Sequence, residues 1–170
     1  VEVLDPLSLA RKTLSNGECE FGYRESRFKK TREIILGCTI KLSVGDTETS
    51  KGKMKEFLSY RNTTQPKGFA SCGCMFKNYE PAPEEIEALR ENGIPEVMLE
   101  KRRISAGWLI DHSGAKEFRE GGVAVSDVHA NFLINVGQAT ARDVNKLIDK
   151  VRTRVAERFG VSLEQEAQII

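Results

Sequence analysis

Residues 68–78 constrain this chain more than any other stretch, and they read Gly-Phe-Ala-Ser-Cys-Gly-Cys-Met-Phe-Lys-Asn. Glycine lets the backbone come close to a ligand without a Cβ in the way. Thiol, ammonium and amide groups beside such a bend can donate protons and hydrogen bonds. Because the apolar pair Met75 and Phe76 follows at once, the bend must lead into something buried. The stretch predicts either a ligand-contacting turn that feeds a strand or merely a tight bend, and these residues alone leave both open.

Composition argues against several classes of protein. The 170 residues include 26 Lys and Arg against 25 Asp and Glu, so no net field favours nucleic acid or a membrane surface. No apolar run approaches the ~20 residues that span a bilayer. The cysteines at 19, 38, 72 and 74 lack paired CxxC spacing, which argues against a structural zinc site. We therefore expect no metal, free thiols in a reducing cytoplasm, and buried, small-hydrophobe roles for Cys19 and Cys38.

The first third of the chain predicts two strands and a helix. Val1–Asp5 alternates weakly, and Ile34–Leu42 is rich in β-branched residues, so both predict strands. Lys51–Arg61 carries apolar residues near a helical spacing. A polar stretch with a proline follows, and we place a domain boundary there, between residues 1–62 and 63–170.

Strands alternate with helices after the central stretch. Pro83 suits the first residue of a helix that Gly93 ends, and Ile104–Asp111 also predicts a helix. Residues 96–103 fit a strand or a helix. Two short strands are expected at Val123–Val125 and Phe132–Ile134.

The last helix is the clearest. Thr140 suits its N-cap and Gly160 its end, with an apolar stripe between them formed by Val144, Leu147, Ile148, Val151 and Val155. Val161–Glu164 and the terminal Ile169–Ile170 predict a final strand. Together these elements indicate a two-part α+β architecture.

Several segments, in order along the chain, resemble motifs of one family, the UDP-N-acetylenolpyruvoylglucosamine reductases. This flavoenzyme makes UDP-N-acetylmuramate for bacterial cell walls. Members typically carry Ser-Ala-Gly-Ser-x-Phe-Lys-Asn, which is similar to the sequence at 71–78. The other matching segments are Phe21–Lys29, Ser105–Asp111, Val125–Asn135 and the tail at 163–170.

The resemblance implies that residues 1–62 end a flavin-binding α+β domain and that residues 63–170 form a small α+β substrate-binding domain. It implies NADPH-driven, FAD-dependent reduction of UDP-N-acetylglucosamine enolpyruvate in peptidoglycan biosynthesis, and so a part in cell shape and division. Val1 matches the middle of the family's flavin domain. We therefore expect a fragment that is inactive alone, with most FAD contacts in the missing amino-terminal part. The oligomeric state stays open.

The resemblance also implies three catalytic residues. Arg24 would bind the substrate carboxylate through its planar guanidinium. Cys74 stands where most members carry a serine, and it would give a proton to the enol intermediate. Glu166, in its acid form, would hydrogen-bond the enolic oxygens. Without the family, the same residues would be a surface arginine in a basic cluster, a structural cysteine in a tight turn and a solvated glutamate on an edge strand.

Four further residues match substrate contacts of the family: Tyr23, Lys77, Asn78 and His129. Lysine and amide donors suit the oxygens of a diphosphate. A lone histidine such as His129 is otherwise more often a hydrogen-bonded structural residue. Gln168 departs from the family, which usually has an arginine at that position.

Two other functions remain open at this stage. The chain could be a non-catalytic module that binds a nucleotide sugar. It could also be a thiol redox protein that uses Cys72 and Cys74, which predicts reversible oxidation near the cytosolic potential.

Overall fold

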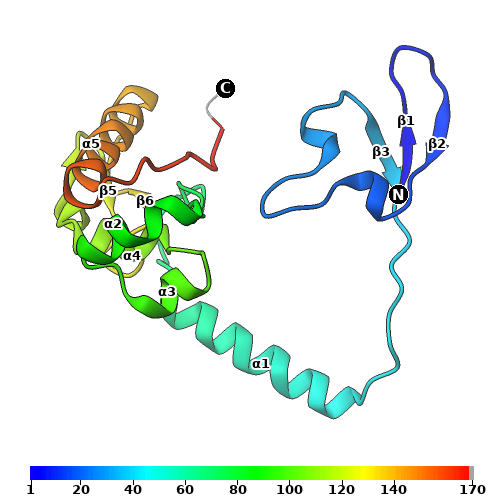
Figure 1. Ribbon diagram of the computed structural model, residues 1–170, viewed down its shortest axis with the longest axis horizontal. Helices are drawn as coiled ribbons and strands as arrows, with labels where there is room; N and C mark the ends of the chain where they lie inside the picture. Colours follow the sequence, from blue (N-terminus) through cyan, green and yellow to red (C-terminus); the bar gives the residue numbers. More distant parts are fainter. Residues whose placement is uncertain (169–170) are drawn as a thin grey trace. The chain divides into compact units, whose positions relative to one another are not determined.

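Helices and antiparallel strands form two units in the computed structural model, which describes residues 1–168 (Figure 1). The units are Val1–Lys51 and Gly52–Ile170. The predicted α+β class is therefore confirmed. The division between the units falls inside α1 (Thr47–Thr64), whereas the domain boundary placed after residue 62 stays a prediction.

The first unit is built on a three-stranded antiparallel sheet with the order β2-β1-β3. Its strands are β1 (Glu2–Leu4), β2 (Arg11–Thr13) and β3 (Ile34–Gly37), and two 3-10 turns, η1 (Gly17–Cys19) and η2 (Arg27–Lys29), lie between β2 and β3. Val3, Leu14 and Cys19 form its small core.

Four predictions for this unit have different outcomes. The strand near the amino terminus is confirmed. The strand expected over Ile34–Leu42 ends at Gly37, because its partner β1 is only three residues long and pairs no further. Cys19 is buried as predicted, but Cys38 is exposed and the prediction for it is wrong, since it lies beyond the paired part of β3.

Helix α1 confirms the helix expected at Lys51–Arg61 and extends it at both ends. None of its residues is buried, and its large apolar side chains are exposed: Met54, Phe57, Leu58 and Tyr60. No helix among residues 1–168 is long and apolar enough to cross a bilayer.

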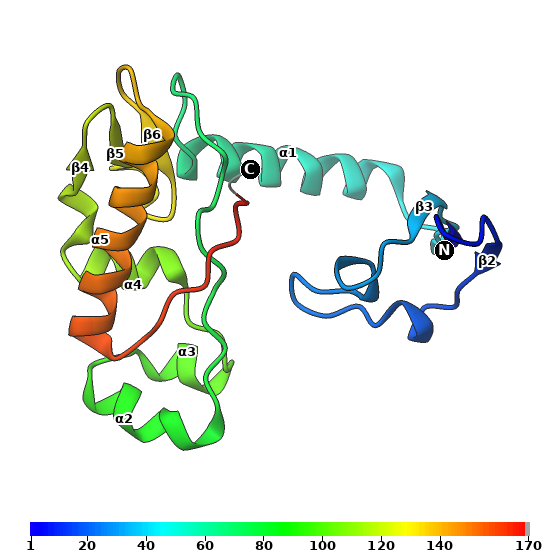
Figure 2. The same cartoon turned by 90° about the horizontal axis from the view of Figure 1, so that it is seen from above.

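The second unit packs helices on a three-stranded antiparallel sheet with the order β4-β5-β6. Helix α5 (Ala141–Phe159) packs along the sheet and against α4 (Ala106–His112), as Figure 2 shows. The remaining elements are η3 (Pro83–Glu85), α2 (Ile86–Glu91), α3 (Glu96–Glu100), η4 (Ala115–Glu117), β4 (Arg119–Glu120), β5 (Val123–Val125) and β6 (Leu133–Asn135).

The core of this unit confirms the apolar stripe expected on the last helix. Leu147, Ile148, Val151 and Val155 are all buried there, and Val144 packs against them in part. The core also receives the apolar residues of α4, of β5 and of the central stretch.

Local chemistry fixes both ends of α5. The Thr140 hydroxyl accepts a hydrogen bond from Asp143 N (3.2 Å), and the Asp143 carboxylate accepts one from Thr140 N (2.9 Å). These bonds satisfy backbone donors that a helix start leaves without intrahelical partners. Gly160 ends the helix with a φ of 69°, a left-handed conformation that glycine adopts without a Cβ penalty. The predicted N-cap and stop are both confirmed.

Thr140→Ala is expected to lower the free energy of unfolding by about 1 kcal/mol, because it leaves Asp143 N without its side-chain acceptor. Thermal and urea unfolding measure this change. Thr153→Ala is the matched control, since Thr153 lies exposed in the middle of the same helix. Equal stability of the two variants would contradict a capping role for Thr140.

Most other elements follow the sequence closely. Pro83 opens η3, which runs into α2, and Gly93 follows the helix end with a φ of 88°. The undecided stretch at 96–103 contains a short helix, α3. The helix expected from Ile104 starts at Ala106, because Ser105 acts as its N-cap. Of the two expected short strands, β5 matches and β6 begins one residue late.

The strand predicted at Val161–Glu164 is wrong. Val161 and Leu163 are buried and alternate with exposed neighbours, but the only main-chain pairing of residues 161–164 with the described part of the chain is at Glu164, whose carbonyl accepts from Lys77 N, so no strand forms. The described tail makes one isolated β-bridge, from Gln165 to Phe76. Ile169–Ile170 lies outside the described residues.

Candidate functional site

The central stretch continues as an extended segment that makes four bridges to three distant parts of the second unit. Its isolated β-bridges join Ala70 to Asn135, Cys74 to Phe132, Phe76 to Gln165 and Tyr79 to Ile104. Met75 and Phe76 are buried, so the expected lead into the core is confirmed. The expected strand is not formed, because the pairings along this segment are isolated bridges that do not run on into a continuous ladder.

Gly73 makes the turn in front of Cys74. Its φ is 87°, and its N–H donates to the Ser71 hydroxyl at 3.2 Å. A Cβ added at Gly73 would meet no heavy atom within 4 Å, so the backbone beside Cys74 is open. Cys74 itself is half-buried, whereas Cys72 is exposed.

Asn131 holds one side of the extended segment. Its side-chain Oδ1 accepts from Phe76 N (2.9 Å), and its Nδ2 donates to Phe76 O (2.8 Å). Its main-chain carbonyl accepts from Met75 N at 2.8 Å. The side chain is buried, with the residue only 3% exposed. Sequence reasoning assigned Asn131 no role, because no local pattern shows which asparagine will be buried against a distant backbone.

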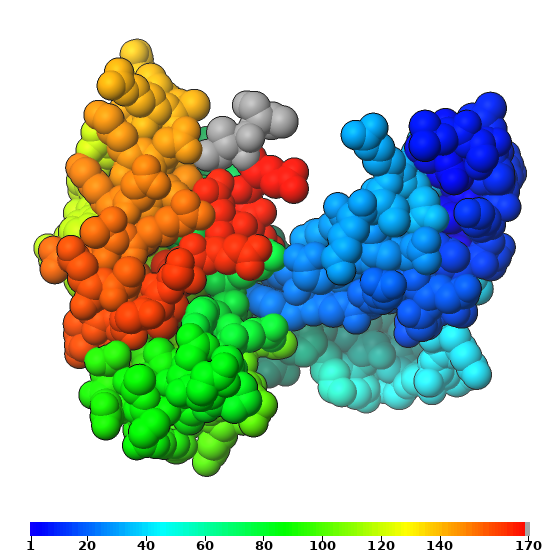
Figure 3. Space-filling model, turned by 45° about the horizontal axis from the view of Figure 1, so that its top comes forward, coloured from blue at the N-terminus to red at the C-terminus, as the bar shows by residue number. Residues whose placement is uncertain are grey.

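The carboxy-terminal tail holds the other side of the segment. Lys77 N donates to Glu164 O, and Glu166 N donates to Met75 O, both at 2.8 Å. Figure 2 shows the segment and the tail running side by side, and Figure 3 shows the tail on the surface beside α5. Met75, the neighbour of Cys74, is therefore bonded both to Asn131 and to Glu166.

His129 lies two residues before Asn131 and is half-buried. Its Nδ1 accepts from Asn131 N at 3.3 Å, and its ring centroid is 4.9 Å from that of Phe132. Burial penalises the charged ring and holds the pKa of His129 below its ordinary value. Because a backbone N–H can only donate, this contact favours the neutral ring with its proton on Nε2.

Lys77 and Asn78 make contacts with two different elements. Lys77 Nζ lies 2.6 Å from Glu164 Oε1, and the lysine side chain is 14% exposed against 70% for the glutamate. Asn78 Oδ1 accepts from Ala106 N (3.1 Å) at the start of α4. The structure therefore brings Cys74, Lys77, Asn78, His129 and Glu166 onto adjoining segments of the second unit.

Tyr23 and Arg24 belong to the first unit, where they form a tight turn. Gly22 N donates to Glu25 O (2.9 Å), and Glu25 N donates to Gly22 O (3.3 Å). Arg24 has a φ of 55°, which is uncommon for a residue other than glycine and is typical of functional or strained sites. Its guanidinium carbon lies 5.3 Å from the centre of the Tyr23 ring. The Arg24 carbonyl also accepts a hydrogen bond from Lys29 Nζ.

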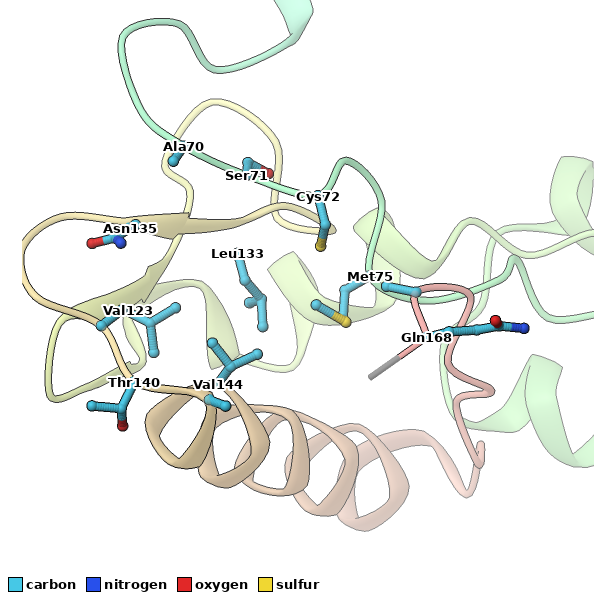
Figure 4. A pocket seen from close by; sticks show the side chains of 13 residues that line it. Ala70, Ser71, Cys72, Met75, Val123, Leu133, Asn135, Thr140, Val144 and Gln168 are labelled. Atoms are coloured by element: carbon cyan, nitrogen blue, oxygen red, sulfur yellow. The ribbon is translucent and has the colours of Figure 1, made fainter. Parts of the chain in front are cut away.

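A pocket of about 510 Å³ opens beside the central stretch (Figure 4). Its walls are mainly apolar and include Met75, Leu133 and Val144, and both Cys72 and Gln168 line it. Among residues 1–168, no group of three or more His, Cys, Asp and Glu side chains is placed to hold a metal ion.

Residues 65–170 match the family described as "UDP-N-acetylenolpyruvoylglucosamine reductase, C-terminal domain". The chain belongs to this family. The resemblance drawn from the ordered motifs is therefore confirmed.

Relatives of this family match nearly the whole chain. The chain is 32% identical over 164 residues to the UDP-N-acetylenolpyruvoylglucosamine reductase of Solibacter usitatus, with 95% of this chain and 51% of the relative covered. The reductase of Thermotoga maritima is 36% identical over 170 residues, with 99% and 52% covered. The chain thus spans about half the length of the curated relatives it matches.

The fold agrees with this assignment. The crystal structure of UDP-N-acetylenolpyruvylglucosamine reductase from Thermus caldophilus is similar with a TM-score of 0.69 at 33% identity. The match covers 99% of this chain and 51% of that chain.

Proposed function

We propose that the protein carrying this chain reduces UDP-N-acetylglucosamine enolpyruvate to UDP-N-acetylmuramate, with FAD as cofactor and NADPH as reductant, in cytoplasmic peptidoglycan biosynthesis. Family membership supports the reaction. The observation that carries the proposal is the pairing of Met75 with both Asn131 and Glu166. This pairing holds Met75, which directly follows Cys74, between the segment that contains His129 and the segment that contains Glu166.

The chemistry of these side chains matches the needs of the reaction. FAD, when bound and reduced by NADPH, supplies a hydride to the vinyl carbon. The electron pair of the carbon–carbon double bond then moves toward the carboxylate, and the neighbouring carbon needs a proton. A cation or an acid must hold the developing enolate, and a positioned donor must give that proton.

We assign these tasks to three residues. Arg24 binds the substrate carboxylate, which its planar guanidinium suits, and it is an exposed residue with a left-handed φ. Glu166 hydrogen-bonds the enolic oxygens. Cys74 Sγ gives the proton, for which a thiol suits because its usual pKa of about 8.5 lies far below that of an alcohol.

Four residues bind the rest of the substrate in this proposal. Lys77 Nζ and the Asn78 amide donate to diphosphate oxygens. His129 donates through Nε2–H, since its Nδ1 accepts from Asn131 N. Tyr23 lies beside Arg24 in the same turn and contacts the substrate there.

The turn at Gly73 fits the approach of a planar cofactor. Open space around a glycine backbone lets a flat ring come close to the chain beside Cys74.

Kinetics of the full-length protein test this proposal. We expect NADPH oxidation that depends on the enolpyruvyl ether and yields one equivalent of the saturated product. Binding of the nucleotide sugar without its reduction would instead support a non-catalytic binding module. Reversible oxidation that requires both Cys72 and Cys74, without substrate reduction, would support a thiol redox protein.

The 170-residue chain by itself is expected to retain no FAD and to have no reductase activity. The reason is that it spans about half the length of the reductases it matches. Visible absorbance of the purified chain, with added FAD removed by gel filtration, measures this. A yellow protein with one flavin per chain would contradict the expectation.

A further inference from the structure

We propose that Asn131 is a positioning residue that holds the Cys74 turn and the His129 ring in one fixed arrangement. This inference rests on the proposed function, because it concerns the proton donor and a substrate contact of that reaction. It adds a residue to which no role in the reaction has been given.

The first step of the argument is the way Asn131 binds Phe76. Its side-chain amide pairs with both the N–H (2.9 Å) and the C=O (2.8 Å) of that one residue, 55 positions away. The side chain thus acts as a strand neighbour would, at a place where the backbone forms only isolated bridges. Phe76 is 1% exposed, so water cannot replace these bonds if the amide is removed.

The second step joins Asn131 to Cys74. The Asn131 carbonyl accepts from Met75 N at 2.8 Å, and Met75 directly follows Cys74. Phe132 directly follows Asn131 and forms a bridge with Cys74. The main chain on the carboxy-terminal side of the proton donor is therefore held on one side by Asn131 and its neighbour, opposite the carboxy-terminal tail.

The third step joins Asn131 to His129. Asn131 N donates to His129 Nδ1, which leaves Nε2 as the protonated nitrogen that can donate to a ligand. Gly107 bounds the ring on one side, since a Cβ there would lie 3.2 Å from His129 Cε1. Phe132 contacts the same ring at a centroid distance of 4.9 Å.

The arrangement explains why an asparagine is needed at this position. Aspartate would keep the acceptor for Phe76 N but would place a second oxygen against Phe76 O, where the donor stood. Leucine would leave both backbone groups of Phe76 without partners. Only a side chain that offers a donor and an acceptor together can bond both the N–H and the C=O of Phe76.

Asn131→Asp in the full-length enzyme is expected to lower kcat for substrate reduction by roughly 10²-fold, since a displacement of about 1 Å in a catalytic group can cost that much. Reduction of the flavin by NADPH should stay unchanged, because that half-reaction needs neither Cys74 nor His129. Stopped-flow absorbance separates the two steps. Equal slowing of both steps, or of neither, would overturn the proposal.

A matched asparagine controls for a purely structural effect. Asn92 Nδ2 donates to Phe159 O (3.2 Å) at the far end of α5, so Asn92→Asp also removes a donor from a main-chain carbonyl. We expect it to lower the melting temperature without slowing substrate reduction. A loss of activity in Asn92→Asp equal to that in Asn131→Asp would show that only stability matters.

Two measurements remain decisive if Asn131→Asp does not fold. In the unaltered enzyme, ¹⁵N NMR of labelled histidine should show His129 with its proton on Nε2. A proton on Nδ1 would refute the hydrogen bond from Asn131 N to the His129 ring. Gly107→Ala, inside α4, should move the His129 ring, shift the Asn131 amide resonance and raise KM. An unshifted Asn131 amide in this variant would also refute that hydrogen bond.

The same set of experiments separates this inference from the proposed function. If the unaltered full-length protein does not reduce the enolpyruvyl ether, the proposed function fails. The histidine tautomer and the Asn131 amide shift are read without turnover, so they still decide whether Asn131 holds the His129 ring.

Discussion

Cys74→Ala in the full-length enzyme is expected to slow substrate reduction by roughly 10²–10⁴-fold, the usual value of a positioned general acid. The change removes the proposed proton donor but leaves the main chain in place. Asn131 and Glu166 both bond the backbone of Met75, and Phe132 pairs with the backbone of Cys74, so none of these contacts needs the thiol. Single-turnover oxidation of the reduced flavin by substrate measures the effect.

Two further cysteine variants control this experiment. Cys74→Ser should keep substantial activity, because a hydroxyl can donate the same proton and most family members resemble this variant. Cys72→Ala should leave the rate of substrate reduction nearly unchanged, since alanine is common at the matching family position and Cys72 is exposed. Alkylation at Cys74 should inactivate the enzyme, and saturating substrate should protect it. Equal losses on removal of either cysteine would refute a proton donor and support a disulfide or metal pair.

Glu166→Gln is expected to slow the substrate half-reaction by roughly 10²-fold or more while flavin reduction by NADPH proceeds normally. Glutamine has nearly the same shape but cannot give the carboxyl proton that the proposed enolate contact uses. The backbone of residue 166 should stay in place, because it bonds Met75 O through its N–H. Stopped-flow absorbance measures each half-reaction.

A surface glutamate provides the control for Glu166. Glu157→Gln, on the exposed side of α5, changes the charge equally and should leave both half-reactions unchanged. Unchanged half-reactions in Glu166→Gln itself would return Glu166 to the role of a solvated residue in the tail.

The sequence by itself determined the parts of the fold that local chemistry controls. Thr140 and Gly160 bound α5 as expected, because a hydroxyl acceptor and a left-handed glycine act on neighbouring backbone groups. Pro83 and Gly93 do the same for the helical turn between them. The ordered motifs also identified the family, since their residue types and their order are specific to it and can be recognised in the sequence without a structure.

Only the tertiary structure decided which of these motifs meet. The amide of Asn131 bonds Phe76 across 55 positions, and Glu166 bonds Met75 from the far end of the chain. The same dependence on distant partners explains the errors. β3 ends early because β1 is short, and Val161–Glu164 alternates like a strand but meets the central stretch only at its last residue, where Glu164 O accepts from Lys77 N. Strand pairing and the hydrogen bonds of a buried side-chain amide depend on distant partners that no local pattern specifies. In caps and turns, by contrast, the hydrogen-bond partners are only a few residues apart in the sequence.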